Sequence, residues 1–182
     1  MNINTRKESK KDYDSITEVI KSAFWRTGKE ESFNEWTLVD KIRNSECYIN
    51  DLSLVAEVDD KICGHIMVTP LNIRNMNNTF QSLAIAPVSV SKEYQKKAIG
   101  KKLMESVIEH SKKLGYKSIV VLGDPNYYTK FGFKKAIDYD IKLNDDLKEY
   151  LFALELKEGG LKGVNGIIEY CSAFYNEVGE LI

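Results

Sequence analysis

The sequence contains few of the residues that build metal centres or disulfide frameworks. It has two histidines, His65 and His110, and three cysteines, Cys47, Cys63 and Cys171. Because the cysteines are odd in number and far apart, we expect neither a disulfide framework nor a metal site. Persistent disulfides belong to oxidising compartments, so the cytoplasm is the expected location.

Long apolar runs and an excess of basic charge are also missing. No apolar run approaches the roughly 18 residues that cross a membrane, and the first eight residues lack the apolar segment of a signal peptide. Lysine and arginine total 26 against 27 aspartate and glutamate, for a net charge of −1. A nucleic-acid-binding domain normally carries a basic excess, so we expect neither a membrane nor a nucleic-acid partner.

The residues that are present fit one folded domain spanning residues 1–182. Hydrophobic residues make up 43% of the chain, and no repeat or linker-like tract interrupts them. Residues 3–7 predict a short strand. Residues 12–26 and 33–43 repeat apolar side chains at helical spacing, which predicts two helices, the first with Asp12 as its N-cap.

The centre of the chain predicts a hairpin followed by a strand–helix–strand unit. Apolar and polar residues alternate over 52–68 around a turn, which is typical of a β-hairpin. A strand over 80–90, the strongest helix of the chain over 98–114 and an apolar strand over 118–122 follow. Pro87 cannot donate to a β-ladder, so it marks a bulge, an edge or a break in its strand.

The last third of the chain predicts one short helix and three strands. Asp124 precedes Pro125 in the sequence, and we expect it to cap the helix. The strands are expected over 133–143, 151–156 and 166–174. Helices and strands that alternate in this way predict the α/β fold class.

Two segments carry residue patterns with chemical meaning. The segment from Gln95 to Gly100 precedes the strongest helix, where free N–H groups and the helix dipole favour an anion. A solvated, lysine-rich helix start explains the same residues without a ligand. Tyr127 and Phe131 are four residues apart and share a helix face, which assigns Tyr127 to packing and leaves Tyr128 for a cleft. Packing of both tyrosines is the alternative.

The ordered set of these motifs resembles the GNAT family of N-acetyltransferases, from about residue 3 to residue 174. The resemblance is carried by Gln95-x-x-Ala98-x-Gly100 before a helix, by the apolar strand 118–122 and by Tyr127-Tyr128-x-Lys130-Phe131-Gly132-Phe133. The segment that starts at Leu122-Gly123-Asp124-Pro125 is similar more narrowly to the bacterial YhbS-like branch. So are the segments Leu52 to Glu57, Gly64 to Ile66 and Glu35 to Arg43.

The resemblance implies a GNAT fold, with a mixed, mostly antiparallel sheet, helices on both faces and a splayed pair of parallel central strands. It also implies acetyl-CoA as co-substrate, without a metal. In the family, the strand before the loop pairs with the pantetheine arm, and the loop binds the pyrophosphate through main-chain N–H groups. On this chain these roles fall on Val88, Ser89 and Val90 for the arm, and on Gln95, Lys96, Lys97, Ala98, Ile99, Gly100 and Lys101 for the pyrophosphate.

Two positions depart from the family pattern. The first glycine of the loop is Ala98, which we expect to tolerate the same helical conformation while narrowing the approach to phosphate by one methyl group. The proline that often precedes the loop is Lys92. Coenzyme binding is expected in spite of both changes.

The reaction implied by the resemblance is direct transfer of an acetyl group to a primary amine of a small molecule or peptide, in a ternary complex. Tyr128 matches the family's tyrosine near the coenzyme sulfur and would protonate the departing thiolate. Glu57 and His65 lie on hairpin faces opposite the apolar stripes, so they are candidates to receive the proton of the amine.

Interpretations without a catalytic role stay open for Glu57 and His65. Glu57 fits an exposed strand position, and His65 fits a packed or surface histidine. A non-catalytic acyl-CoA-binding regulatory module is the alternative function, and the sequence predicts a monomer or a homodimer without deciding between them.

Overall fold

The computed structural model describes residues 1–24, 35–143 and 145–181. Its strands are β1 (Asn4–Lys7), β2 (Ser53–Val58), β3 (Lys61–Arg74), β4 (Thr79–Val90), β5 (Ser118–Leu122), β6 (Lys134–Lys135), β7 (Ile141–Lys142), β8 (Leu151–Glu155) and β9 (Gly166–Tyr170). Its helices are α1 (Tyr13–Phe24), α2 (Glu35–Arg43), α3 (Ile99–Lys113) and α4 (Pro125–Tyr128). The chain divides into two compact units: unit 1 comprises Met1–Val68, Ala86–Val107 and Ser172–Ile182, and unit 2 comprises Thr69–Ile85 and Ile108–Cys171.

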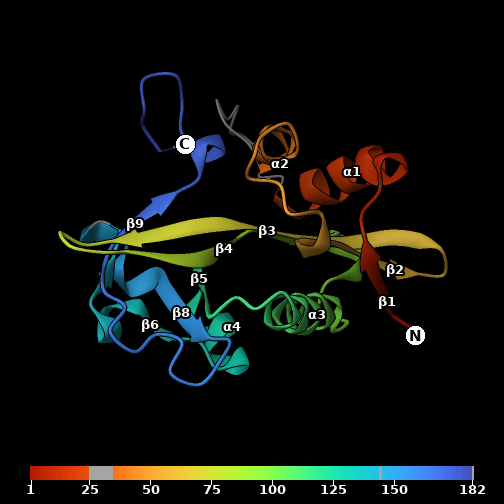
Figure 1. The fold of residues 1–182 in the computed structure, drawn as a ribbon. Coiled ribbons are helices and arrows are strands. Elements are labelled where there is room, and N and C mark those ends of the chain that lie inside the picture. The colour runs from red at the N-terminus through yellow and green to blue at the C-terminus, as the bar shows by residue number, and fades with distance from the viewer. Residues whose placement is uncertain (25–34, 144, 182) are drawn as a thin grey trace. The chain divides into compact units, whose positions relative to one another are not determined.

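Unit 1 is built on antiparallel strands covered by helices. β1 pairs with β2 and β2 pairs with β3, both antiparallel, and the neighbours run in the order β1-β2-β3-β4. Within this unit, α1 and α2 lie on one side of the strands and α3 lies on the other (Figure 1). The apolar stripes read from the sequence are the buried faces: Ile16, Val19 and Ile20 in α1, Leu38, Val39 and Ile42 in α2, and Ile99, Leu103 and Val107 in α3.

The hairpin predicted between β2 and β3 is confirmed. Asp59 and Asp60 form its turn, with φ of 49° and 62°. Left-handed backbone at both central residues matches the twist of the flanking strands, and aspartate tolerates it better than most residues. The register then shifts between Ala56 and Glu57, which is a bulge beside the turn.

The start of α3 packs closely on β3 because Gly64 has no side chain. A Cβ added to Gly64 would lie 2.9 Å from Ile99 Cγ2, 2.9 Å from Leu103 Cδ1 and 3.3 Å from the carbonyl oxygen of Ser89. Carbon atoms normally approach to about 3.5–4.0 Å. Glycine at this position therefore fixes how near the first residues of α3 come to the strand.

Unit 2 holds the parallel pair of strands. Its neighbours run in the order β3-β4-β5-β8-β6, and β9 pairs with β3 and β7. Leu83 of β4 lies beside Ile119 of β5, and Ala84 lies beside Val120, in parallel register. β5 is antiparallel to β8 along its whole length. Side chains from five strands form the core of the unit: Leu71, Ile73, Ala84, Val120, Leu151, Ala153 and Ile168.

The predicted fold class is confirmed, because the protein is α/β, with mostly antiparallel strands and the parallel pair β4–β5. The central helix, predicted over 98–114, begins and ends one residue inside that range, and β5 has the predicted bounds. Residues 25–26 and 33–34 of the first two predicted helices lie outside the described residues.

Two predicted strands are shorter than expected. The range 133–143 contains the two-residue strands β6 and β7, separated by a 3-10 turn over Ala136–Tyr139 that ends at Asp140 with φ of 55°. The strand predicted over 166–174 ends at Tyr170, and Ser172–Phe174 form another 3-10 turn. Apolar periodicity over so few residues does not separate a tight turn from a strand.

The cysteines were expected to form no disulfide framework, but Cys47 is disulfide-bonded, and so is Cys171. Cys63 is a buried free thiol whose Sγ donates to the carbonyl oxygen of Ala56. Spacing along the chain says little about distance in the fold, so an isolated disulfide leaves no sequence pattern.

Candidate functional site

The loop between β4 and α3 has an unusual backbone. A 3-10 turn over Lys92–Tyr94 follows β4, and α3 begins at Ile99. Between them, Lys96 has φ of 60° and Ala98 has φ of 63°. Residues with a side chain rarely adopt this left-handed region. Left-handed residues within a loop bring successive backbone N–H groups together into a concavity that suits an anion.

Six consecutive N–H groups of this loop donate no hydrogen bond within the described part of the chain, namely those of Lys96, Lys97, Ala98, Ile99, Gly100 and Lys101. The first backbone bond of the helix runs from Lys102 N to Ala98 O, at 3.0 Å. A helix N-terminus also carries a partial positive charge. The loop can therefore bind an anion such as a phosphate through its main chain.

The sequence expectation for Ala98 is wrong in one respect. Ala98 precedes the helix and is left-handed, so it does not adopt the helical conformation expected for it. The Cβ of Ala98 therefore adds conformational strain that glycine would avoid. The residue is exposed, and its methyl group lies in the loop that holds the free N–H groups.

Lysine side chains surround these N–H groups. Lys96, Lys97 and Lys101 are exposed. Lys97 Nζ lies 5.1 Å from the centre of the Tyr94 ring, and Lys101 pairs with Glu105 at 3.7 Å. The exposed ammonium groups add positive charge that an anion would meet first, whereas the backbone beneath them is fixed because Ile99 is 1% exposed.

The end of β4 is tied to β3 within unit 1. Ser89 is buried and its Oγ donates to the carbonyl oxygen of His65 at 3.5 Å, while Ser91 N donates to Cys63 O at 3.0 Å. Gln95 Nε2 donates to Val90 O at 3.1 Å, which links the end of the strand to the loop. Val88 and Val90, on either side of Ser89, are half-buried. The residues expected at the coenzyme, from 88 to 101, thus form one continuous segment of unit 1.

Tyr128 belongs to unit 2, where α4 follows β5. Asp124 caps this helix as predicted, because its Oδ1 accepts from Asn126 N at 2.9 Å. Tyr128 is 7% exposed, and burial, with a smaller contribution from the charge of Asp124, raises the pKa of its hydroxyl. That hydroxyl has no hydrogen-bond partner among the described residues, yet it is not one of the fully buried unpaired atoms. The ring is therefore buried while the oxygen reaches the surface.

The neighbouring tyrosine packs as the sequence predicts. The rings of Tyr127 and Phe131 are edge to face, with centres 5.3 Å apart. Tyr127 is nevertheless the less buried tyrosine of the two, and burial raises its pKa as well. Both rings therefore pack, as the alternative interpretation allowed, and the Tyr128 ring is the more enclosed of the two. The assignment of the Tyr128 hydroxyl to a cleft stays a prediction.

Glu57, a candidate base, is held in an ion pair. Arg6 Nε lies 3.0 Å from Glu57 Oε1, and Arg6 also contacts both oxygens of Asp12 at 2.7 and 3.0 Å. Asp12 Oδ2 accepts from Ser9 N at 2.7 Å in the 3-10 turn Lys10–Asp12. Asp12 therefore serves this turn and Arg6, and it is not the N-cap of α1 that the sequence predicted.

His65, the other candidate base, is completely buried. Its Nε2 lies 3.1 Å from Glu8 Oε2 and 3.3 Å from Ser53 Oγ, while its Nδ1 has no partner in the described part of the chain. Burial lowers the pKa of the imidazole despite the opposing effect of Glu8. His65 is therefore neutral near pH 7, and only its buried Nδ1 is free of a hydrogen bond.

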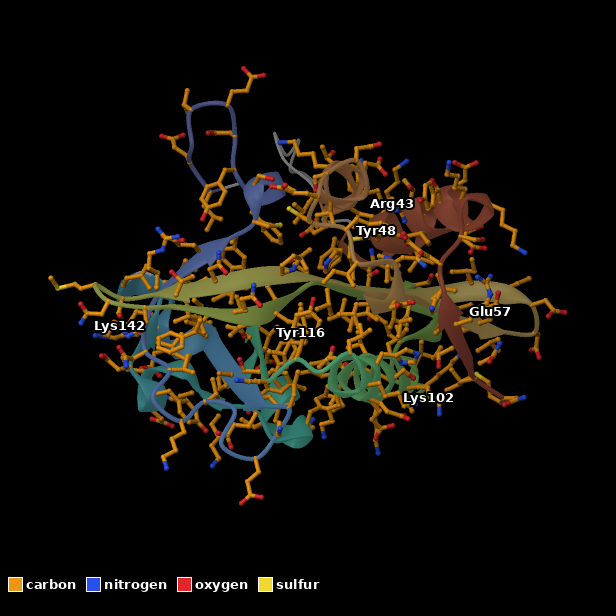
Figure 2. The ribbon with its side chains drawn as sticks, viewed as in Figure 1. Arg43, Tyr48, Glu57, Lys102, Tyr116 and Lys142 are labelled. Carbon is orange, nitrogen blue, oxygen red and sulfur yellow. The ribbon has the colours of Figure 1, made fainter. Side chains whose placement is uncertain are left out.

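Sequence reasoning missed the buried polar network around Glu8. Arg43 forms two hydrogen bonds to the Glu8 carboxylate, at 3.0 and 2.8 Å, and the Tyr48 hydroxyl donates to it at 3.0 Å. Figure 2 labels Arg43 and Tyr48 above the strands of this unit. Burial raises the pKa of Glu8, but the hydrogen bonds from His65 and Arg43 prevail and lower it to about 2.

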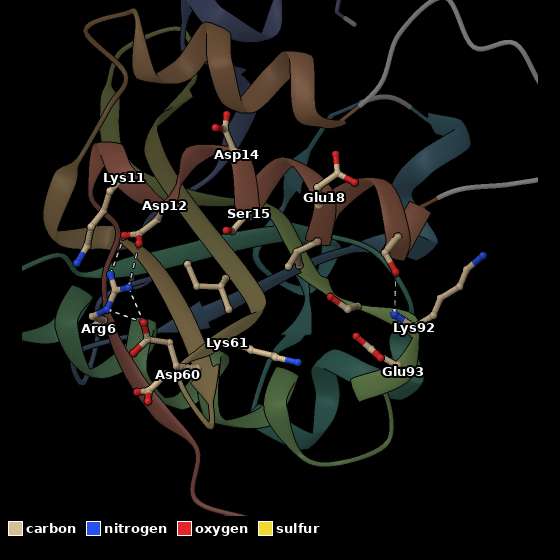
Figure 3. Close-up of a pocket in the computed structure, with 15 residues that line it drawn as sticks. Arg6, Lys11, Asp12, Asp14, Ser15, Glu18, Asp60, Lys61, Lys92 and Glu93 are labelled. Atoms are coloured by element: carbon tan, nitrogen blue, oxygen red, sulfur yellow. Dashed lines mark hydrogen bonds and ion pairs between the residues drawn. The ribbon is translucent and has the colours of Figure 1, made fainter.

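A groove of about 1080 Å³ also lies within unit 1 (Figure 3). α1, the β2–β3 hairpin and the segment after β4 form its walls. Its charged lining comprises Arg6, Lys11, Lys61 and Lys92 and the carboxylates of Asp12, Asp14, Glu18, Glu57, Asp60 and Glu93. The carboxylates outnumber the cations, so the groove favours a cationic occupant.

The described residues contain no group of three or more histidine, cysteine, aspartate or glutamate side chains arranged to hold a metal. None of the described helices has the length and apolar character needed to cross a membrane.

Comparison with known proteins identifies the family. The model of the acetyltransferase (GNAT) family matches residues 12–133. The uncharacterized N-acetyltransferase YhbS of Escherichia coli K12 is 29% identical over 125 residues, which cover 68% of this chain and 74% of YhbS. The uncharacterized N-acetyltransferase YjhQ of the same strain is 31% identical over 125 residues, covering 69% of this chain and 66% of YjhQ.

Solved structures agree with this result. Escherichia coli YhbS in complex with CoA superposes with a TM-score of 0.84 at 24% identity, covering 96% of this chain and 92% of YhbS. A GNAT family acetyltransferase from Brucella melitensis in complex with acetyl-CoA gives a TM-score of 0.75 at 29% identity, covering 95% and 98% of the two chains. The fold and the family match are those of an acyltransferase. The chain belongs to the GNAT acetyltransferase family, which confirms the resemblance seen in the sequence.

The network around Glu8 makes a stability prediction with an internal control. Replacing Glu8 with Gln leaves the Arg43 guanidinium, 4% exposed, without its buried counter-ion. We expect Glu8→Gln to lower the free energy of unfolding by about 3–5 kcal/mol. Asp40→Asn removes the other carboxylate from the same arginine, 3.1 Å away but 58% exposed, and should cost less than about 1 kcal/mol. Urea denaturation at pH 7 measures both, and similar small losses would contradict the argument.

Proposed function

We propose that this protein is an acetyl-CoA-dependent N-acetyltransferase that acts on a primary amine of a small molecule or peptide. The observation that carries the proposal is the run of six N–H groups, before and at the start of α3, that find no partner among the described residues. Related GNAT proteins whose structures contain CoA or acetyl-CoA support it. The proposed co-substrate carries a pyrophosphate, which such a run of N–H groups binds well.

Within this proposal the chain binds the coenzyme in two ways. The main chain of Gln95 to Lys101 holds the pyrophosphate, with the ammonium groups of Lys96, Lys97 and Lys101 around it. Val88, Ser89 and Val90 offer their backbone to the amides of the pantetheine arm, as an added strand would pair with a sheet edge. Gln95 links the two parts through its bond to Val90 O.

Acetyl-CoA supplies the acetyl group as an activated thioester, and the side chains manage the protons. Direct transfer forms the carbon–nitrogen bond and breaks the carbon–sulfur bond. Tyr128 is a candidate to protonate the sulfur because a tyrosine hydroxyl carries its proton at neutral pH, and burial, which raises its pKa further, keeps it protonated. Its oxygen has no competing partner among the residues that the structure describes, and it reaches the surface. The amine in turn loses one proton to a base.

Glu57 and His65 remain the two proposed bases. Glu57 lines the acidic groove, but Arg6 holds one of its oxygens. His65 is neutral and able to accept a proton, but only its buried Nδ1 is unpaired. The pH dependence of kcat/KM for Glu57→Gln and His65→Gln distinguishes them, because only loss of the base removes the acidic limb of the profile.

Both candidate bases, Glu57 and His65, already make hydrogen bonds, and this favours one alternative function. A regulatory module that binds an acyl-CoA without catalysis would keep the loop and need no free base. It would show tight coenzyme binding with neither hydrolysis nor amine-dependent release of the thiol.

Coenzyme binding itself is the first test. A ligand at 100 times its Kd stabilises the fold by about 2.7 kcal/mol, which corresponds to a rise in Tm of roughly 5–10 °C for a chain of this size. We expect a shift of this size when acetyl-CoA is added in thermal denaturation. Adenosine alone, which lacks the pyrophosphate, serves as the control. No shift at millimolar acetyl-CoA would refute the proposed function.

Replacing Ala98 with Gly should stabilise the fold and should not weaken the binding of acetyl-CoA. Because Ala98 has φ of 63°, glycine removes a strain of roughly 1–2 kcal/mol and loses about 0.4–1 kcal/mol through the flexibility of the unfolded chain. The free energy of unfolding should rise by up to about 1.6 kcal/mol, and acetyl-CoA should bind as tightly or more tightly. Ala23→Gly, in the last turn of α1, is the control and should lose up to about 1 kcal/mol. If both changes destabilise equally, the loop conformation is wrong.

Removing the Tyr128 hydroxyl should slow the reaction without unfolding the protein. Tyr128→Phe keeps the ring contacts with Tyr127 and Phe133 and should lower kcat by roughly 10²-fold, with the Kd of acetyl-CoA nearly unchanged. Tyr127→Phe is the control and should change kcat far less. Steady-state kinetics with any accepted amine measure both. A larger loss in Tyr127→Phe would reverse the assignment of the two tyrosines.

A further inference from the structure

The residue after β5 lies directly beneath the ring of Tyr128. A Cβ added to Gly123 would lie 2.5 Å from Tyr128 Cε2 and 3.4 Å from both Cδ2 and Cζ. Gly123 is not among the glycines with positive φ. Its backbone conformation therefore suits any residue, and the reason for glycine at this position is the ring that lies against it.

The ring has little room to move away from this contact. Tyr127 lies edge to face with it at 5.1 Å between ring centres, and Phe133 lies edge to face at 5.8 Å. These two aromatic neighbours and Gly123 together enclose the ring, which agrees with its 7% exposure. A side chain at position 123 would push the ring against residues that already contact it.

The backbone on both sides of the contact is also fixed. Gly123 N donates to Tyr150 O at 2.8 Å, and Tyr128 N donates to Asp124 O at 3.2 Å. Asp124 is in turn the N-cap of α4. Because the main chain is held at both residues, the ring must absorb a clash at Gly123, and the hydroxyl at its end would move with it.

We infer that Gly123 is a positioning residue for the reaction, because its lack of a side chain sets the direction in which the Tyr128 hydroxyl points. This inference rests on the proposed role of Tyr128. Moving Cε2 from 2.5 Å to an ordinary carbon contact of about 3.5 Å requires a shift of roughly 1 Å. A misplacement of this size reduces the rate by up to about 10²-fold when the group acts in the chemical step.

The test is Gly123→Ala measured with and without the Tyr128 hydroxyl. We expect Gly123→Ala to lower kcat by roughly 10- to 100-fold, with the Kd of acetyl-CoA changed less than about threefold. In the Tyr128→Phe background, Gly123→Ala should cause no further loss, because the group that it displaces is already absent. Losses that multiply in the double variant would show a general structural effect and overturn the inference. Leu122→Ala, at the exposed neighbouring residue, is the control and should leave kcat unchanged.

Failure of this inference is separable from failure of the proposed function. If Tyr128→Phe keeps the kcat of the unaltered protein, the proposed role of the hydroxyl is wrong, and the inference falls with it. If Tyr128→Phe lowers kcat and Gly123→Ala does not, only the inference is wrong.

If Gly123→Ala folds poorly, a measurement of its thermal stability still tests the inference. The drop in Tm that this variant causes should disappear when Tyr128→Ala removes the ring. An equal drop in both backgrounds would overturn the inference, because the added methyl group would then be meeting something other than the ring.

Discussion

The close approach of α3 to β3 is the constraint on which the coenzyme loop depends. Ile99 is at once the first residue of the helix and a core residue, and Gly64 allows it to come within a distance that any side chain would prevent. The free N–H groups are therefore part of a helix end that cannot rotate. Preorganised donors of this kind bind an anion without first paying to become ordered. The left-handed residues Lys96 and Ala98 carry the strain of joining β4 to this fixed point.

The buried Glu8–Arg43 pair performs a comparable task for α2 in the same unit. Arg43 is the last residue of α2, and its guanidinium also stacks on Tyr13 of α1, with 3.8 Å between its central carbon and the ring centre. Two helices are thereby linked to the segment after β1 by groups that bind in only one geometry. Such a pair adds little net stability compared with an apolar core, but its directional bonds select one arrangement of the helices.

The sequence predicts the parts of the fold that local patterns specify. The hairpin turn at Asp59 and Asp60, the buried stripe of α3 and the strand 118–122 follow from residue type and period, and all three are confirmed. The coenzyme loop was located by family resemblance. The left-handed conformation of Ala98 was not predicted, because it is required by the positions at which β4 ends and α3 begins, and these depend on distant packing contacts. Glu8 was missed for a similar reason, since its partners are 35, 40 and 57 positions away in the chain.

The protonation states of the residues in the proposed site indicate which residue can donate a proton and which can accept one. Tyr128, like any tyrosine, carries its proton at neutral pH, and burial raises its pKa further, so its hydroxyl cannot act as the base. The proton of the amine must then leave through another group. Glu57 meets this requirement more easily than His65, because Arg6 also has Asp12 as a counter-ion and would stay paired if Glu57 became protonated. Protonating His65 would instead place a charge in a completely buried site, and burial lowers the pKa of the imidazole even though the Glu8 carboxylate favours its charged form. The arrangement of charges in unit 1 thus favours Glu57 as the proposed base.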